Sequence, residues 1–214
     1  EDFSDAEQKL LSGYIMVTLE NEEKKAAFIS AQHELVRELT HAEVEHTVIG
    51  PKEAFVESIG QNLNLIRKRL PISELTVEEY SMGSISRTAV AVVYIAGITN
   101  EDNINTIKQR LENVDFDEIA DSSYIVQLIS DNSRSPFPQL LDTERPDRAA
   151  AVLAEGKIVI VVDGSPHVLI SPTTFSEFFS SFEDYFLNWI IASFVRILRA
   201  FSVIFSIQIT SIYV

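Results

Sequence analysis

The 214-residue sequence contains no cysteine, so the chain forms no disulfide and binds no metal through thiolates. It also lacks the short motifs of common enzymes, namely a glycine-rich dinucleotide loop, a Walker A loop, a G-x-S-x-G elbow and an H-E-x-x-H zinc helix. Hydrophobic residues make up 46% of the chain and charged residues 23%, which is the composition of a folded domain. We therefore predict a folded protein that is not an enzyme and that holds no metal or cofactor.

Positive charge is scarce, because 17 Lys and Arg residues stand against 32 Asp and Glu residues, a net charge of −15. Residues 1–183 carry 15 basic and 31 acidic residues, a balance of −16. Residues 184–214 carry only Asp184, Arg196 and Arg199, a balance of +1. Since an acidic protein repels phosphate backbones, we expect no nucleic-acid partner, and solubility is the simplest role of the excess acid.

Strand-like and helix-like patterns follow one another along the chain, which predicts an α/β fold with mixed sheets flanked by helices. We expect strands at residues 13–19, 26–29, 75–77, 88–95, 157–162 and 167–170, and helices at 31–44, 51–70, 101–113, within 116–130 and at 145–156. The run 88–95 is apolar almost throughout, which is typical of a central strand covered on both faces. Pro51 suits a first helical position, and Phe55 to Leu70 carry apolar residues at helical spacing.

An internal similarity suggests two related halves. Leu10–Gly13 followed by a strand resembles Leu153–Gly156 followed by a strand, and a second apolar strand comes after each. We interpret this as two similar α/β subdomains, the first of them truncated, although a helix–Gly–strand unit is common enough to recur by chance. The predicted division is residues 1–49, residues 50–183 and a C-terminal segment 184–214.

The C-terminal segment has the pattern of a membrane entry. Tyr185 and Trp189 belong to an aromatic cluster that precedes Arg196 and Arg199, and the 15 residues 200–214 carry no charge. Aromatic residues and arginines commonly mark the membrane interface, and flanking arginines favour the cytoplasmic side. We predict an interfacial helix and the start of a transmembrane segment, with a cytoplasmic soluble part. The alternative is a buried C-terminal helix, because serine, threonine and glutamine weaken the hydropathy.

Two loops are candidates for function. The segment 143–148 places arginines and acids around a helix start and follows an extended proline loop, and together they are a candidate interface or hinge made of Ser135, Pro136, Phe137, Pro138, Glu144, Arg145, Asp147 and Arg148. The alternative for 143–148 is helix capping with local ion pairing. A second loop is a candidate ligand turn made of Asp163, Gly164 and Ser165, and a simple hairpin turn is its alternative.

Several segments, taken in order, resemble the A subunit of the spore germinant receptors of endospore-forming bacteria. They are Gly50-Pro-Lys-Glu-Ala-Phe55, Asn62-Leu-Asn-Leu-Ile-Arg-Lys-Arg69, Val92-Val-Tyr-Ile-Ala-Gly97, Ser135-Pro-Phe-Pro-Gln139, Thr143-Glu-Arg-Pro-Asp-Arg148, Val162-Asp-Gly-Ser-Pro166, Asp184-Tyr185 and Arg196-Ile-Leu-Arg199. The likeness covers residues 50–214 and extends more loosely over 1–49. His167 departs from it, since an apolar residue is more usual there, and Ser84-Ile85 stands where basic residues are common.

The resemblance implies a cytoplasmic region of two α/β subdomains before a membrane domain, in a nutrient receptor of the spore inner membrane. Implied partners are a transporter-like B subunit, a lipoprotein C subunit and further copies of the A subunit. We expect this chain to relay the signal or to organise the receptor during germination. The competing hypothesis is a domain that binds a small molecule between two α/β lobes.

Overall fold

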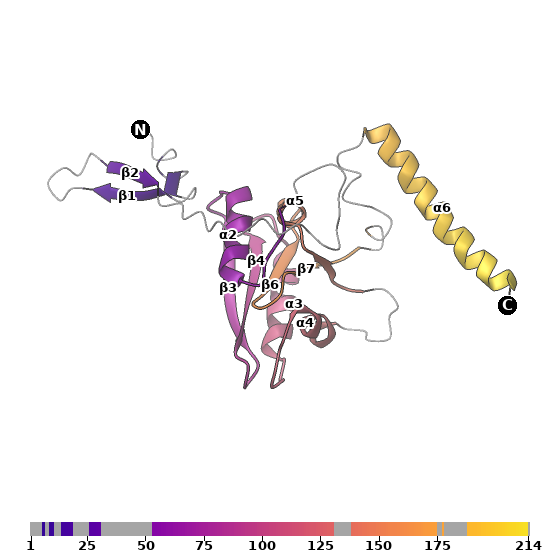
Figure 1. Cartoon of the computed structure of the whole chain (residues 1–214), viewed down its shortest axis with the longest axis horizontal. Helices are drawn as coiled ribbons and strands as arrows, with labels where there is room; N and C mark the ends of the chain where they lie inside the picture. The colour runs from indigo at the N-terminus through magenta and orange to yellow at the C-terminus, as the bar shows by residue number, and fades with distance from the viewer. Residues whose placement is uncertain are drawn as a thin grey trace. The chain divides into compact units, whose positions relative to one another are not determined.

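The computed structural model describes residues 6, 9–10, 14–18, 26–30, 53–130, 138–174, 177 and 188–213, and it divides the chain into two units. One unit comprises residues 1–45 and 52–172 and holds two sheets; the other comprises residues 46–51 and 173–214 and holds one long helix (Figure 1). The predicted α/β class with a C-terminal apolar helix is confirmed. The predicted helix at 31–44 lies outside the described residues.

The first sheet is a two-stranded hairpin. β1 (Tyr14–Thr18) pairs antiparallel with β2 (Ala26–Ser30), and Tyr14 lies opposite Ser30. Residues 6, 9 and 10 before it are helical. Residues 146–171 also contain a helix followed by an antiparallel hairpin, and the division into two similar subdomains stays a prediction.

The second sheet has five strands in the order β3-β4-β6-β7-β5. They are β3 (Leu75–Met82), β4 (Thr88–Ile95), β5 (Leu141–Thr143), β6 (Ile158–Val162) and β7 (Val168–Ser171). The prediction of a mixed sheet is wrong for these strands, because all four pairings are antiparallel. The short turns at 83–87 and 163–167 make the β3–β4 and β6–β7 pairs antiparallel, since a parallel neighbour would need a long crossover.

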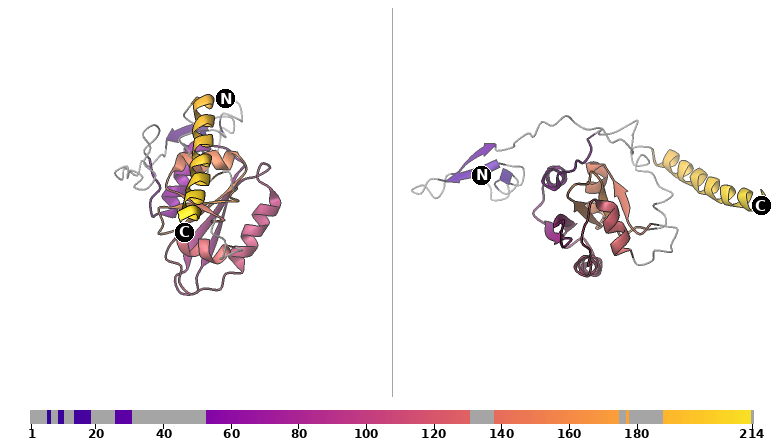
Figure 2. Two further views of the ribbon diagram at one scale, coloured as in Figure 1. Left: turned by 90° about the vertical axis from the view of Figure 1, so that its right-hand side faces the viewer. Right: turned by 60° about the horizontal axis from the view of Figure 1, so that its bottom comes forward.

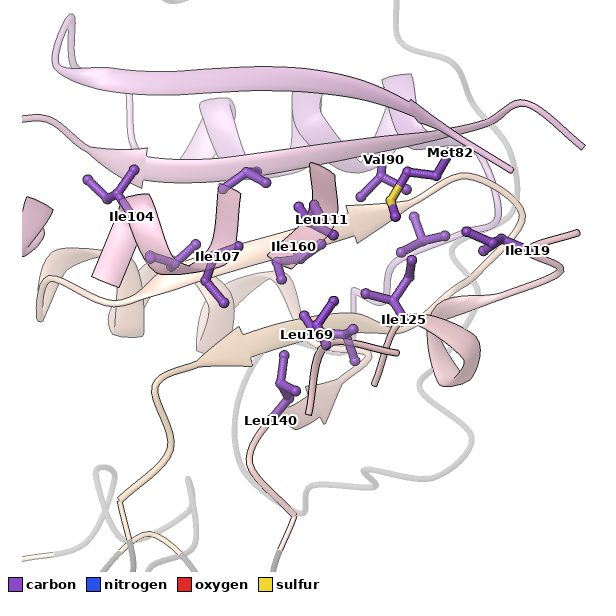
Figure 3. Packing of buried hydrophobic residues seen from close by; sticks show 14 residues of the cluster. Met82, Val90, Ile104, Ile107, Leu111, Ile119, Ile125, Leu140, Ile160 and Leu169 are labelled. Atoms are coloured by element: carbon purple, nitrogen blue, oxygen red, sulfur yellow. The ribbon is translucent and has the colours of Figure 1, made fainter. Parts of the chain in front are cut away.

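Helices cover both faces of the five-stranded sheet (Figure 2). α2 (Ile59–Arg69) and α5 (Pro146–Ala154) pack with Val159 and Val161 of β6. α3 (Glu101–Glu112) and α4 (Ser122–Ile129) pack with Ile158, Ile160 and Val162 of the same strand, and Figure 3 shows side chains from α3 lying over Ile160. Successive side chains of a strand point to opposite faces of the sheet. Because each face of this sheet packs against its own helices, every residue of β6 is apolar.

Local signals fix the ends of these helices. The Asn100 side chain accepts a hydrogen bond from the backbone N–H of Asp102 at 2.8 Å and caps α3. Pro146 occupies the first turn of α5, where a missing N–H costs nothing. Gly156 ends the same helix with a φ of 88°, a left-handed conformation that favours glycine.

Two local predictions need correction. The helix expected from Pro51 begins only at Ile59, because the preceding residues are tied to other segments: the Phe55 N–H donates to the carbonyl of Glu144 at 2.8 Å, and the Val56 N–H donates to Asn62 Oδ1 at 2.8 Å. Phe55 is buried, as its place in the apolar stripe predicted. It lies before the helix, however, in a segment that is held by these hydrogen bonds. The three-residue strand β5 was not anticipated, since three residues are too few to show a period.

The second unit contains α6 (Trp189–Tyr213), which coincides with the predicted C-terminal membrane segment. It is the only helix among the described residues that is long and apolar enough to cross a bilayer, over Trp189–Ser206. Only 6% of that window is buried. The alternative of a buried helix is therefore not supported.

Candidate functional site

Residues Thr143–Arg148, named the α5 clasp below, join β5 to α5 at one edge of the sheet. Arg145 is only 2% exposed, and its backbone N–H donates to Thr143 Oγ1 at 3.2 Å. Its guanidinium donates two parallel hydrogen bonds to Asp147, from Nε to Oδ1 at 3.0 Å and from Nη2 to Oδ2 at 2.6 Å. Asp147 also lies in the first turn of α5, where the helix dipole favours a negative charge. The clasp thus has the local ion pair that the sequence offered as part of the alternative to an interface, but no side-chain hydrogen bond from Arg145 caps α5.

His167 connects the α5 clasp to the neighbouring strand. Its Nε2 lies 3.4 Å from Glu144 Oε1 and its Nδ1 lies 3.6 Å from Asp142 Oδ2, so the ring lies between two carboxylates. Glu144 is buried, whereas the Asp142 side chain is 68% exposed. Sequence reasoning missed this contact, although the unusual histidine at this position was a signal that could have led to it.

The candidate ligand turn lies between β6 and β7 and holds other segments in place. Asp163 Oδ1 accepts from the backbone N–H of Ile59 at the start of α2, at 3.1 Å. The Gly164 N–H donates to the carbonyl of Glu57 at 2.7 Å, and the buried Ser165 hydroxyl lies 3.0 Å from that of Ser122 at the start of α4. These contacts give the turn a structural role, and ligand binding there stays a prediction.

The structure brings some of the remaining candidates together and leaves others apart. Arg148 is half-buried within the α5 clasp, and Pro138 is exposed. Ser135, Pro136, Phe137 and Tyr185 lie outside the described residues. In the part of the chain that is described, no group of three or more His, Cys, Asp or Glu side chains is arranged to hold a metal ion.

A cluster that sequence reasoning missed joins β3, β4 and α3. Glu78 Oε1 accepts hydrogen bonds from the Tyr94 hydroxyl at 2.6 Å and from Lys108 Nζ at 2.7 Å, and Oε2 accepts from the Tyr80 hydroxyl at 3.1 Å. Burial alone would raise the pKa of Glu78, but the three donors together outweigh it, so the pKa lies below its ordinary value. The bond to Glu78 raises the pKa of Lys108 in turn. Glu78 and Lys108 are 30 residues apart in the chain, so no local sequence pattern predicts their contact.

The α6 helix exposes large apolar side chains along most of its length. Trp189 is 76% exposed, Phe194 65% and Ile209 62%. Arg196 and Arg199 interrupt the apolar sequence within the window that is long enough to span a bilayer. Exposed apolar surface of this extent indicates contact with lipid or with another protein.

Comparison with known proteins identifies the family. A family model described as Bacillus/Clostridium GerA spore germination protein matches residues 1–214. The chain belongs to the GerA family. The resemblance predicted from the α5 clasp and its neighbouring segments is confirmed.

Relatives of this GerA-family chain include spore germination protein GerQA of Bacillus cereus, 47% identical over 210 residues, and spore germination protein KA of Bacillus subtilis (strain 168), 40% identical over 190 residues. The matches cover 98% and 89% of this chain but only 42% and 35% of those proteins. The GerA-family chain therefore spans less than half the length of the curated relatives it matches.

A solved structure is also similar to this GerA-family chain. It is the crystal structure of the N-terminal domain of the A subunit of the Bacillus megaterium spore germinant receptor GerK3, with 35% sequence identity and a TM-score of 0.58. The match covers 82% of this chain and 62% of that one. The GerA-family homology supports a role in spore germination.

Proposed function

We propose that this chain is the N-terminal module of a germinant receptor A subunit, which organises the receptor or relays its nutrient signal without an enzymatic step. The soluble part lies on the cytoplasmic, or core, side of the spore inner membrane. Its partners are a transporter-like B subunit, a lipoprotein C subunit and further copies of the A subunit. The observation that carries the proposal is the family match over the whole chain together with the likeness to a receptor N-terminal domain.

The structure supports the membrane part of this proposal through α6. Apolar side chains that are more than half exposed, such as Ile190, Phe194 and Phe201, would be unfavourable in water over this length. A bilayer removes this cost, and α6 belongs to a unit separate from the five-stranded sheet. The module thus combines a folded α/β domain with a helix suited to lipid.

The α5 clasp suggests how the module keeps its shape. Arg145 and Asp147 are nearly buried and close a charge pair at the helix start, so we assign them to stability and assembly. Asp142 lies beside them on the edge strand and is mostly exposed, so it can contact another subunit without breaking the core. We assign signal relay or partner contact to this exposed edge.

The test uses spores whose only germinant-receptor A subunit is the complete protein that contains this chain. Variants are Asp147→Ala for the buried pair, Asp142→Asn for the exposed edge and Glu79→Gln as a matched control, an exposed acid on the opposite edge strand. Loss of refractility after adding an amino acid or a sugar measures germination, and immunoblotting of spore membranes measures receptor abundance.

We expect Asp147→Ala to lower abundance and germination together, and Asp142→Asn to slow germination at normal abundance. Glu79→Gln should change neither. The proposal fails if spores that lack the complete subunit respond to the same nutrients as fast as the parent. Equal behaviour of Asp142→Asn and Glu79→Gln would remove the role of the exposed edge and leave assembly as the function.

A further inference from the structure

The first half of α6, residues 189–199, has two different sides and is named the arginine half. With about 100° of rotation per residue, Arg196 and Arg199 lie on one side, together with Trp189, Ala192 and Ser193. The opposite side, about 120° wide, carries only apolar residues of this half: Ile190, Ile191, Phe194, Ile197 and Leu198. This is the pattern of an amphipathic helix with a cationic polar side.

Both sides of the arginine half carry exposed residues, among them Trp189 on the arginine side at 76%. The apolar side is open, since Ile190, Phe194 and Ile197 are 59%, 65% and 56% exposed. Ala192, on the arginine side, is 6% exposed and is the one buried hydrophobic residue among the described residues of α6. The apolar surface of this half is therefore exposed, and so is Trp189 beside the arginines.

The position of the arginines conflicts with a span that starts at Trp189. The window Trp189–Ser206 has 18 residues, which gives about 27 Å of helix, close to the thickness of a hydrocarbon core. Its midpoint falls between residues 197 and 198, so Arg196 and Arg199 would both lie within about 3 Å of the bilayer centre. A charged side chain is least tolerated there.

We propose that the arginine half is a docking surface for anionic phospholipid headgroups. It lies in the headgroup layer, its apolar side enters the upper acyl region, and Arg196 and Arg199 bind lipid phosphates. Charge supports an anionic lipid surface as the occupant: these two arginines are the only charged residues of α6, on a chain that is otherwise strongly acidic. The inference rests on the proposed membrane location and adds to it the depth and the lipid class.

The single tryptophan of the chain provides the probe for lipid preference. Trp189 lies within about 20° of Arg196 around the helix axis, two turns away along it. The complete 214-residue chain is reconstituted in mixed phosphatidylcholine and phosphatidylglycerol vesicles, with bromine on the acyl chains of one lipid or the other. Quenching of Trp189 by each brominated lipid then reports which lipid is its neighbour.

We expect phosphatidylglycerol to be favoured over phosphatidylcholine as the neighbour of Trp189 by about fivefold or more. Each arginine near an anionic surface strengthens binding by about 1 kcal/mol, which is a factor of about five in the binding constant. Arg196→Gln/Arg199→Gln should bring the preference close to one. The matched control Arg67→Gln/Lys68→Gln removes two exposed cations from α2 in the other unit and should leave it unchanged.

The depth of the helix is measured with a moved tryptophan, Trp189→Phe/Leu198→Trp, and lipids brominated near the top or near the end of the acyl chain. The inference expects stronger quenching from the upper position, within about 10 Å of the headgroups. A span that begins at residue 189 would place position 198 about 14 Å further in and favour the lower position.

The outcomes separate this inference from the proposed function. Strong quenching from the lower position, equal quenching by both lipids, or a tryptophan shielded from all brominated lipids by another copy of α6 would overturn the inference and leave the membrane location intact. A chain that fails to float with vesicles of either composition would overturn the proposed membrane location itself.

Discussion

Replacing Asp147 by asparagine tests whether the α5 clasp is a structural element. The variant keeps the size of the side chain and one acceptor oxygen, but it removes the negative charge that receives two hydrogen bonds from Arg145. The guanidinium is 2% exposed and the Asp147 side chain 11%, so water replaces little of what is lost.

The expected cost follows from this burial. Removing one partner of a buried ion pair typically costs about 3–5 kcal/mol, and because asparagine retains one acceptor we expect about 3 kcal/mol for Asp147→Asn. For a chain of this size, a loss of about 3 kcal/mol corresponds to a melting temperature lower by roughly 6–12 °C. Since the pair is shielded from solvent, added salt should change this difference little.

Thermal unfolding followed by circular dichroism, on the complete chain in detergent, measures the effect. Asp142→Asn is the matched control, because it makes the same chemical change in a side chain that is 68% exposed, and a change within about 0.5 kcal/mol is expected. If Asp147→Asn and Asp142→Asn melt within about 2 °C of each other, the assignment of the α5 clasp to stability is refuted.

Three further predictions concern the five-stranded sheet and its helices. The pKa of Glu78 is lowered in the folded state, so its carboxylate stabilises the fold fully above the unfolded pKa of about 4.3, and this stabilisation is lost as pH falls through the folded pKa. The difference in melting temperature between wild type and Glu78→Gln should therefore be constant near neutral pH and shrink below about pH 4.3. Gly156→Ala should cost about 1–2 kcal/mol in urea unfolding, since the residue has a φ of 88° and an added Cβ would lie 3.1 Å from the Ile98 carbonyl oxygen. Ile160→Ala in the central strand should cost about 3–4 kcal/mol by the same measurement, and a loss below about 1 kcal/mol would contradict its place in the core.

The sequence predicted best those elements whose signals are local. The apolar run of β4 and the helix–Gly–hairpin at α5, β6 and β7 were found close to their observed bounds, because periodicity and Gly156 act within a few residues. The start of α2 was misplaced because Phe55 is buried by contact with a segment about 90 residues further along the chain. Spacing in sequence cannot distinguish that burial from a helical stripe.

In the candidate site, too, local contacts could be predicted from the sequence and contacts between distant segments could not. The Arg145–Asp147 pair spans two residues and could be proposed from the sequence as local pairing. The contacts of His167 with Asp142 and Glu144 depend on the pairing of β5 with β7, and the bond between Glu78 and Lys108 depends on α3 crossing the sheet near β3. Such contacts follow from topology, which the sequence left open between parallel and antiparallel neighbours.

The outer edge of β3 bears on whether two copies of the protein can pair through their sheets. This strand is eight residues long and stands at the end of the sheet, where its outward backbone groups could pair with the same strand of another molecule. Glu79 is exposed near the middle of that edge, so two molecules approaching edge to edge would bring its carboxylates together, whereas the Glu78 carboxylate is bound to Lys108. The exposed charge of Glu79 therefore disfavours joining of the sheets of two neighbouring molecules along β3.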